Sequence, residues 1–185
     1  MSKIAVIIGS IREGSYSRKI AEALPELVPQ HQFEIVPIDE LSFFSEDLEA
    51  SPPESWTAFR SRITASEAVL FITPEYVRSV PGVLKNAIDI GSRPYGKGAL
   101  TGKPAAIIST SLGAIGGFGA NHHLRQSLAS LDMPTLGQPE AYIGNSATLF
   151  DEGGRLSNEN TAEFLKSFIH RFSQFIGEKA RAMAA

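Results

Sequence analysis

Hydrophobic residues along the chain follow two patterns: short continuous runs and longer stretches with helical spacing. Five of the short runs are typical of strands that are covered on both faces of a parallel sheet, which are apolar nearly throughout. The five runs are Lys3–Ile8, Phe33–Ile38, Ala68–Thr73, Lys103–Thr110 and the weaker Pro139–Ile143.

The stretches between these runs carry apolar residues three or four positions apart, which predicts amphipathic helices. The first stretch has Ile20, Leu24, Leu27 and Val28 on one face, and Pro29 ends it. Similar spacing predicts helices over Ser55–Ser66, from Pro81 to Ile88 and from Leu124 to Leu131.

A last helix is expected to start near Asn160, because Asn160 and Glu163 have the spacing of a capping box. Its buried stripe is predicted to be Phe164, Leu165, Phe168, Ile169, Phe172, Phe175 and Ile176. Strands that alternate with helices over short connections indicate an α/β fold, an open parallel sheet with helices on both faces. For five strands we expect the order 2-1-3-4-5 and a single domain over residues 1–185.

The composition limits the reactions that the side chains of this protein can perform. The 185 residues include no cysteine, which excludes thiolate nucleophiles, disulfides and iron–sulfur clusters, so any redox role requires a bound agent. A net charge of -3 gives no basic footprint for nucleic acid, and no apolar run is long enough for a membrane span. The four histidines, His31, His122, His123 and His170, do not suggest a metal site. We expect a cytoplasmic protein with no nucleic-acid or membrane partner.

In such a sheet, ligands bind beyond the carboxyl ends of the strands, so the loops after strands one, three and four are the candidate site. The first loop, Gly9–Ser17, leads into a helix N-terminus, where unpaired N–H groups and the helix dipole favour an anion. Its serine hydroxyls and Arg12 are suited to phosphate oxygens. The alternative is a polar turn with a serine N-cap.

The second loop, Thr73–Gly82, is stiffened by two prolines and can present backbone groups to the edge of a planar heterocycle, with Tyr76 near the ring. Here Tyr76 could instead belong to the core and Glu75 could be a solvated charge. The third loop, Ser111–Gly119, contains four glycines that would let a ligand approach the backbone, or would simply make the crossover flexible.

Together these loops resemble the NADPH-dependent FMN reductase family of the flavodoxin-like superfamily, particularly its bacterial quinone, chromate and azo-dye reductases. The matching stretches are Gly9–Ser17, Thr73–Asp89 and Gly113–Gln126. The resemblance implies a flavodoxin-like three-layer sandwich that binds FMN, oxidises NAD(P)H and passes two electrons to a small-molecule acceptor. It also implies a homodimer or homotetramer with sites at subunit boundaries.

The resemblance places the FMN phosphate on the first loop and the isoalloxazine against the other two. The implied phosphate residues are Ser10, Arg12, Ser15, Tyr16 and Ser17. The implied ring residues are Pro74, Glu75, Tyr76, Val77, Ser111, Gly113 and Gly116. FMN carries the chemistry in such enzymes, so no catalytic side chain is assigned. Arg93 is a candidate for attracting anionic substrates or the phosphate of NAD(P)H, and is equally well explained as a surface arginine.

Three residues depart from the family pattern. Val77 stands where an asparagine is usual, Ile90 where a tryptophan is frequent, and Gly119 where relatives often carry an arginine. Two other functions remain open at this stage: a flavodoxin-type FMN electron carrier that does not oxidise NAD(P)H, and a dinucleotide-binding protein without flavin. The missing Gly-x-Gly-x-x-Gly argues against the latter. The sequence selects neither the physiological acceptor nor NADH over NADPH.

Overall fold

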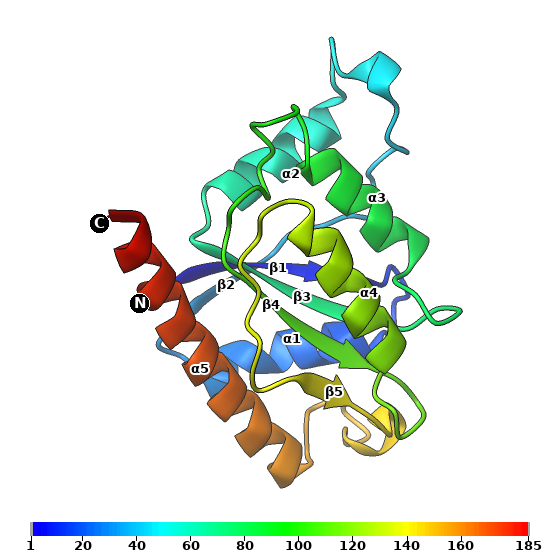
Figure 1. Cartoon of the computed structure of the whole chain (residues 1–185). Coiled ribbons are helices and arrows are strands. Elements are labelled where there is room, and N and C mark those ends of the chain that lie inside the picture. The colour runs from blue at the N-terminus through cyan, green and yellow to red at the C-terminus, as the bar shows by residue number, and fades with distance from the viewer. Residues whose placement is uncertain (1, 185) are drawn as a thin grey trace.

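One five-stranded sheet organises the chain (Figure 1). The computed structural model describes residues 2–184. The strands are β1 (Lys3–Ile8), β2 (Gln32–Ile35), β3 (Ala68–Pro74), β4 (Ala105–Thr110) and β5 (Ala141–Ile143). They lie in the order β2-β1-β3-β4-β5 with every neighbouring pair parallel, which confirms the predicted fold class and strand order.

Helices cover both faces of the sheet, as Figure 1 shows. One face packs against α1 (Tyr16–Leu27) and α5 (Glu159–Ala184). The other packs against α2 (Glu54–Thr64), α3 (Gly82–Gly91) and α4 (Phe118–Ala129). Two short 3₁₀ helices, η1 (Glu46–Leu48) and η2 (Ser146–Thr148), lie in the connections.

Alternation along the strands divides the core between the two faces, because successive side chains of a strand point in opposite directions. In β1, Val6 packs with α1 and α5, whereas its neighbour Ile7 packs with the opposite helices. Both are fully buried, as are Phe71 and Phe168 in the two clusters. Each such side chain contributes on the order of 1.5–3 kcal/mol by leaving water, so the strands are fixed from both sides.

The second strand is shorter than predicted. The apolar run continues to Ile38, and Val36 and Ile38 are indeed buried, but the ladder ends at Ile35. The N–H of Val36 makes a last bond to the carbonyl of Val6, and Pro37 then has no N–H to continue the pairing. Burial therefore extends beyond the strand, and the hydrophobic pattern alone does not show where the strand ends.

The capping residue predicted for the last helix was wrong. The helix begins at Glu159, and the side-chain oxygen of Asn158 accepts the N–H of Thr161 at 2.9 Å, so the cap lies two residues earlier than Asn160. Glu163 does not reach back to the helix start, because its carboxylate pairs with Lys166 at 2.6 Å. The predicted buried stripe is confirmed, with Phe164 and Phe175 only partly buried at its margins.

Candidate active site

A pocket of about 480 Å³ lies at the carboxyl edge of the sheet, where the loops after β1, β3 and β4 gather on the right of Figure 1. Its volume falls in the range of roughly 300–1,000 Å³ that is usual for small-molecule sites. The lining residues are Ser10, Arg12, Ser15, Tyr16, Ser17, Pro74, Glu75, Tyr76, Thr110, Ser111, Leu112 and Ser146. The three predicted loops therefore form one site.

The loop after β1 supplies hydrogen-bond donors at one end of this pocket, which we call the anion end (Ser10–Ser17). Ser15 is the N-cap of α1 and its hydroxyl accepts the N–H of Arg18 at 3.4 Å. The N–H groups of the first helical turn point out of the helix end, and the helix dipole adds partial positive charge there. Ser17 is 1% exposed, and its hydroxyl has no hydrogen-bond partner within residues 2–184.

Arg12 contributes the positive charge of the anion end. The exposed arginine makes no ion pair within residues 2–184, so its guanidinium is available to a ligand. It is held over the ring of Tyr16, 5.5 Å from the centroid, and Tyr16 in turn stacks on Phe150 at 5.9 Å. Cation–π contact of this kind orients the guanidinium without neutralising it.

The loop after β3 is built differently, because its charges satisfy one another. The Glu75 side chain is only 9% exposed. One carboxylate oxygen accepts the backbone N–H of Ala120 at 3.1 Å, in the first turn of α4, and the other accepts a hydrogen bond from Arg78 at 2.7 Å. Gly117, the N-cap residue of α4, has no side chain that could cap the helix, and Glu75 supplies that cap. Glu75 is therefore not a solvated charge.

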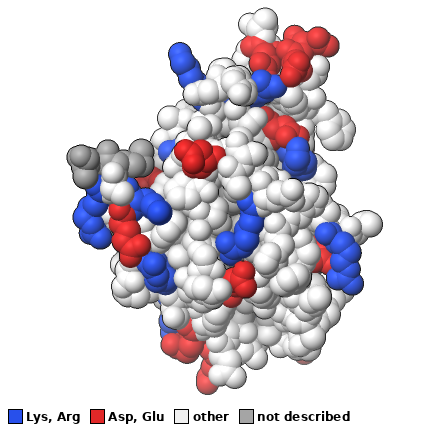
Figure 2. Space-filling view, in the orientation of Figure 1, with Lys and Arg blue, Asp and Glu red and all other residues white. Residues whose placement is uncertain are grey.

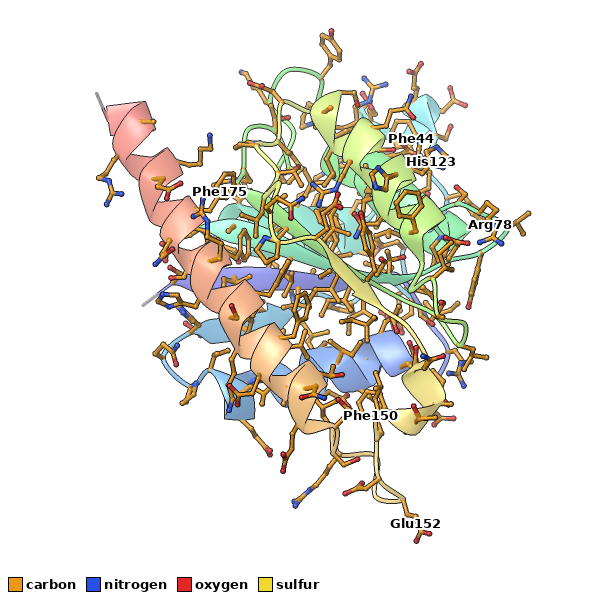
Figure 3. The ribbon with its side chains drawn as sticks, turned by 60° about the horizontal axis from the view of Figure 1, so that its bottom comes forward. Phe44, Arg78, His123, Phe150, Glu152 and Phe175 are labelled. Carbon is orange, nitrogen blue, oxygen red and sulfur yellow. The ribbon has the colours of Figure 1, made fainter. Side chains whose placement is uncertain are left out.

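A two-residue turn closes this second loop. The N–H of Tyr76 donates to the carbonyl of Ser79 at 3.0 Å, and the reverse bond is 2.9 Å. The residues between them, Val77 and Arg78, have φ values of +51° and +60°. The Ser79 hydroxyl also lies 2.7 Å from Nδ1 of His123 on α4. Figure 3 shows His123 on that helix and Arg78 projecting from the loop.

The loop after β4 is fastened to the segment after β5 by buried hydroxyls that sequence reasoning missed. The Ser146 hydroxyl donates to the carbonyl of Ser111 at 2.6 Å. Because a hydroxyl has one hydrogen, Thr110 must donate in its 2.6 Å contact with Ser146. Ser146 is far from the loop in sequence and nothing in its local pattern marks it, whereas Thr110 and Leu112 adjoin the predicted Ser111 and could have been included.

Three of the predicted cofactor residues do not line the pocket: Val77, Gly113 and Gly116. A Cβ at Gly116 would lie 2.5 Å from a backbone atom of Tyr142, and its φ of +63° is in the left-handed region. Gly116 is therefore required for the close crossing of two backbones. The carbonyl of Gly113 accepts the Ser111 hydroxyl at 2.8 Å and so shapes the loop from within.

A serine-rich helix N-terminus with an unpaired arginine, facing a proline-bounded loop, is the arrangement that the sequence resemblance implied. The family model for NADPH-dependent FMN reductases matches residues 2–148 of this chain. The chain belongs to the NADPH-dependent FMN reductase family. A quinone reductase of Pseudomonas putida is 56% identical to this family member over 175 residues, 94% of each chain. A 2-hydroxy-1,4-benzoquinone reductase of a Burkholderia species is 41% identical over 178 residues, covering 96% of this chain and 97% of the other.

Solved structures agree with this family assignment. The flavoenzyme FerB, an NAD(P)H:(acceptor) oxidoreductase from Paracoccus denitrificans, superimposes with a TM-score of 0.90 at 39% identity, covering 97% of this chain and 99% of FerB. A flavodoxin from Pseudomonas aeruginosa superimposes with a TM-score of 0.54 at 17% identity, covering 95% and 97%, which shows the fold alone. The predicted flavodoxin-like fold, oxidoreductase class and FMN cofactor are confirmed at the level of the family.

The residues of this reductase-family pocket fit FMN. The anion end offers hydroxyls, helix N–H groups and one unpaired guanidinium, which match a phosphate monoester. The Ser17 hydroxyl is buried without a partner, and a ligand oxygen would satisfy it. The opposite end, with Pro74, Tyr76 and Leu112, offers apolar and aromatic surface to a planar ring.

Two departures from the family pattern have structural explanations. Ile90 is fully buried in the core cluster of α2, α3 and α4, so it fills space and adds no aromatic surface to the site. The predicted glycine-rich loop extended to Gly119, but α4 begins at Phe118. Gly119 therefore lies in the first turn of this helix. A Cβ at 119 would lie 2.9 Å from the Glu75 carboxylate.

Arg93 does not reach the pocket within one chain. Its guanidinium pairs with Glu46 at 2.8 Å and Glu49 at 3.1 Å, and lies over the ring of Phe44, 5.4 Å from the centroid. Two carboxylates of the acidic stretch over 46–49 are thus paired with Arg93. The substrate role of Arg93 stays a prediction.

The two adjacent histidines of α4 have different partners. His122 contacts the Tyr142 hydroxyl at 2.9 Å, whereas His123 contacts Ser79. Burial and a hydrogen bond with Glu140 raise the pKa of Tyr142 to about 12. Within residues 2–184 no group of three His, Asp or Glu side chains is arranged for a metal ion. The helices of that range include none long and apolar enough to cross a bilayer.

Proposed function

We propose that this protein is an FMN-dependent NAD(P)H oxidoreductase that reduces quinones by two electrons. The observation that carries the proposal is the anion end of the pocket, where within residues 2–184 Arg12 makes no ion pair and the buried Ser17 hydroxyl makes no hydrogen bond. The printed activities of the relatives, quinone reductase and 2-hydroxy-1,4-benzoquinone reductase, support the substrate class.

The chain's own groups bind and orient in this scheme. Arg12 and the N-terminus of α1 hold the phosphate of the cofactor, which fixes one end of the molecule. Pro74 and Tyr76 border the end of the pocket that would take the flavin ring, and Glu75 links their loop to α4. FMN, when bound, supplies hydride chemistry that no side chain of this cysteine-free protein provides.

The overall reaction takes a hydride from NAD(P)H and gives NAD(P)⁺ and a hydroquinone. The quinone gains two electrons and two protons, one of which comes from solvent. The donor and the acceptor have to use the same pocket, since the three loops enclose one site at the carboxyl edge. We therefore expect NAD(P)⁺ to leave before the quinone enters, which is ping-pong kinetics.

Several finer points belong to the same proposal. Chromate, azo dyes and free flavins are further acceptors, because a reduced flavin open to solvent reacts with many oxidants. A homodimer or homotetramer and a cytoplasmic location also stay predictions from the sequence.

Anaerobic mixing of the FMN-loaded protein with NADPH or NADH tests the function. Loss of the yellow flavin absorbance, followed by its return when a quinone is added, is the expected result. A flavin that stays oxidised with both nucleotides would contradict the proposal and favour an electron carrier of the flavodoxin type. Steady-state double-reciprocal plots should be parallel, and intersecting plots would contradict the ping-pong order.

A further inference from the structure

Ser146 joins two segments of the pocket that are distant in sequence. It is fully buried and lines the pocket, although it follows β5 and belongs to none of the three predicted loops. It makes two hydrogen bonds to the carbonyl of Ser111, one from its N–H at 3.1 Å and one from its hydroxyl at 2.6 Å. Two donors use both lone pairs of a carbonyl oxygen. The peptide group between Ser111 and Leu112 is therefore held in one orientation.

This orientation decides which group of the peptide a ligand can meet. The peptide bond is trans, so the N–H of Leu112 points away from the Ser111 carbonyl. Among the described residues this N–H has no acceptor. The other donors of Ser111 are in use, since its N–H donates to Ile143 at 3.0 Å and its hydroxyl to Gly113 at 2.8 Å. The Leu112 N–H is therefore the donor that this peptide can offer to a ligand.

The same serine gives a neighbouring hydroxyl the opposite character. Thr110 is 2% exposed and lines the pocket. Because Ser146 gives its one hydrogen to Ser111, Thr110 must donate in the 2.6 Å contact between the two hydroxyls. Towards a ligand, the Thr110 oxygen can then only accept. Ser146 thus fixes one acceptor and one donor on the stretch Thr110–Leu112, which we call the polar wall.

Charged side chains are absent from the segments that form and support the polar wall. Residues 110–118 and 141–150 include no Lys, Arg, Asp or Glu. Figure 2 shows their region, at the lower right of the molecule, as largely white. A ligand edge against this wall would therefore be recognised by neutral hydrogen bonds, which weaken steeply when donor and acceptor are misaligned. Recognition of this kind depends on the groups being held in place.

We propose that Ser146 is a positioning residue that sets the hydrogen-bond polarity of the polar wall for the pyrimidine edge of the flavin ring. That edge carries the N3–H donor between two carbonyl acceptors, so it requires an acceptor and a donor side by side on the protein. The Thr110 oxygen and the Leu112 N–H are such a pair. The dimethylbenzene edge of the ring has no hydrogen-bonding group to match them. This inference rests on the proposed function, because it takes FMN as the ligand, and it names the edge of the ring that the wall recognises.

The test uses FMN and 3-deaza-FMN, in which a C–H replaces the N3–H donor without adding bulk. Calorimetric titration of the FMN-free protein gives the two Kd values, and their ratio reports the hydrogen bond that N3–H makes. A neutral hydrogen bond changes a binding constant by about three- to tenfold, so the wild type should bind 3-deaza-FMN more weakly than FMN by that factor.

The two hydroxyls of the pair are then removed in turn. Ser146→Ala leaves the Thr110 hydrogen uncommitted and the Ser111 carbonyl with one bond fewer, so the Kd ratio should fall at least about twofold. Thr110→Val removes the acceptor at nearly constant shape and should bring the ratio to about one. Ser146→Thr keeps the hydroxyl and should retain the wild-type ratio.

Thr148→Ala is the matched control. Its hydroxyl also donates to a backbone carbonyl in η2, that of Asn145 at 3.0 Å, but Thr148 is exposed and does not line the pocket. The ratio in this variant should equal that of the wild type. Tm of the FMN-free protein is measured for every variant, and if Ser146→Ala does not fold, Thr110→Val decides the question.

Three results would overturn the inference. The first is a wild-type ratio of about one, since N3–H would then have no acceptor on the protein. The second is a Ser146→Ala protein that binds both flavins more weakly by the same factor, since Ser146 would then only support the fold. The third is a Thr110→Val protein that keeps the wild-type ratio.

The failure of the proposed function gives a different result, because it is measured by anaerobic reduction with NAD(P)H and not by binding. If the wild type binds FMN with the expected ratio but neither nucleotide reduces the bound flavin, the function falls and the inference stands. If the flavin is reduced and the ratio does not depend on residues 110 and 146, only the inference falls. If the wild type binds neither flavin, both fall.

Discussion

The two ends of the pocket are built on opposite principles. At the anion end, Arg12 makes no ion pair and the Ser17 hydroxyl makes no hydrogen bond within the part of the chain that the structure describes, so both can bind a ligand. At the ring end, which we define as the loop 74–79, Glu75 and Arg78 satisfy each other and the N-terminus of α4. In the proposed function, one end would bind an anion by charge and hydrogen bonds, and the other would support a ring by shape. Substitutions at the two ends should therefore separate cofactor affinity from stability.

Arg12→Ala should have the largest effect on affinity. A hydrogen bond to a charged group contributes about 1.5–3 kcal/mol, so the Kd for FMN should rise about 10- to 100-fold. Riboflavin, which lacks the phosphate, should bind equally well to wild type and variant. Arg18→Ala is the control, because Arg18 lies on α1 but does not line the pocket. Fluorescence titration measures the Kd of FMN and of riboflavin for all three proteins, and an equal loss for riboflavin would show that Arg12 does not bind the phosphate.

Glu75→Ala should mainly lower stability. It removes a nearly buried carboxylate that caps α4 and pairs with Arg78, which costs about 1–2 kcal/mol and lowers Tm of the FMN-free protein by about 2–8 °C. Glu46→Ala removes a largely exposed ion pair with Arg93 and should change Tm by less than about 2 °C. Calorimetry measures the Tm shifts of the two variants. Similar shifts in the two variants would mean that Glu75 has no special structural role.

Ser17→Ala and Ser15→Ala should affect different quantities. The Ser17 hydroxyl has no hydrogen-bond partner among the described residues, so its removal should leave Tm without FMN unchanged or slightly higher, while the Kd for FMN rises about three- to tenfold. Ser15 is an N-cap, so its removal should lower Tm by about 1–4 °C as well as weaken FMN binding. If Ser17→Ala destabilised the FMN-free protein as much as Ser15→Ala, the division between the two serines would be wrong.

Val77→Asn should raise Tm of the FMN-free protein by about 2–4 °C, because it relieves roughly 1 kcal/mol of backbone strain. Val77→Thr keeps the β-branch and should leave Tm near the wild-type value. Thermal unfolding measures both. A fall in Tm for Val77→Asn would indicate that the valine contributes packing energy, although its side chain is exposed.

The sheet and the location of the site were predictable, because both depend on local patterns. Continuous apolar runs identify β1, β3 and β4, and parallel strands bring the loops that follow them to one edge. The presence of hydrogen-bond donors at the anion end was also predictable, because serine hydroxyls, Arg12 and the N–H groups of a helix start all suit an anion. The alternative role, a serine N-cap, applies to Ser15 as well.

The contacts between loops could not be predicted, because they join residues distant in sequence. Glu75 caps a helix that begins more than forty positions later, and Ser146 reaches back to Ser111. Neither contact has a signal in the local pattern. The close approach of Gly116 to the backbone of Tyr142 was missed for the same reason. The left-handed turn at Val77 was hidden because a valine is the residue least expected there.

The taper of the sheet has a consequence for how copies of this chain can associate. The central strand β3 has seven residues, whereas the edge strands β2 and β5 have four and three. An edge this short offers few unpaired backbone groups to another strand, so aggregation by strand addition is disfavoured. Any association between folded copies would have to use side-chain surfaces, which can be changed one residue at a time without disturbing the sheet.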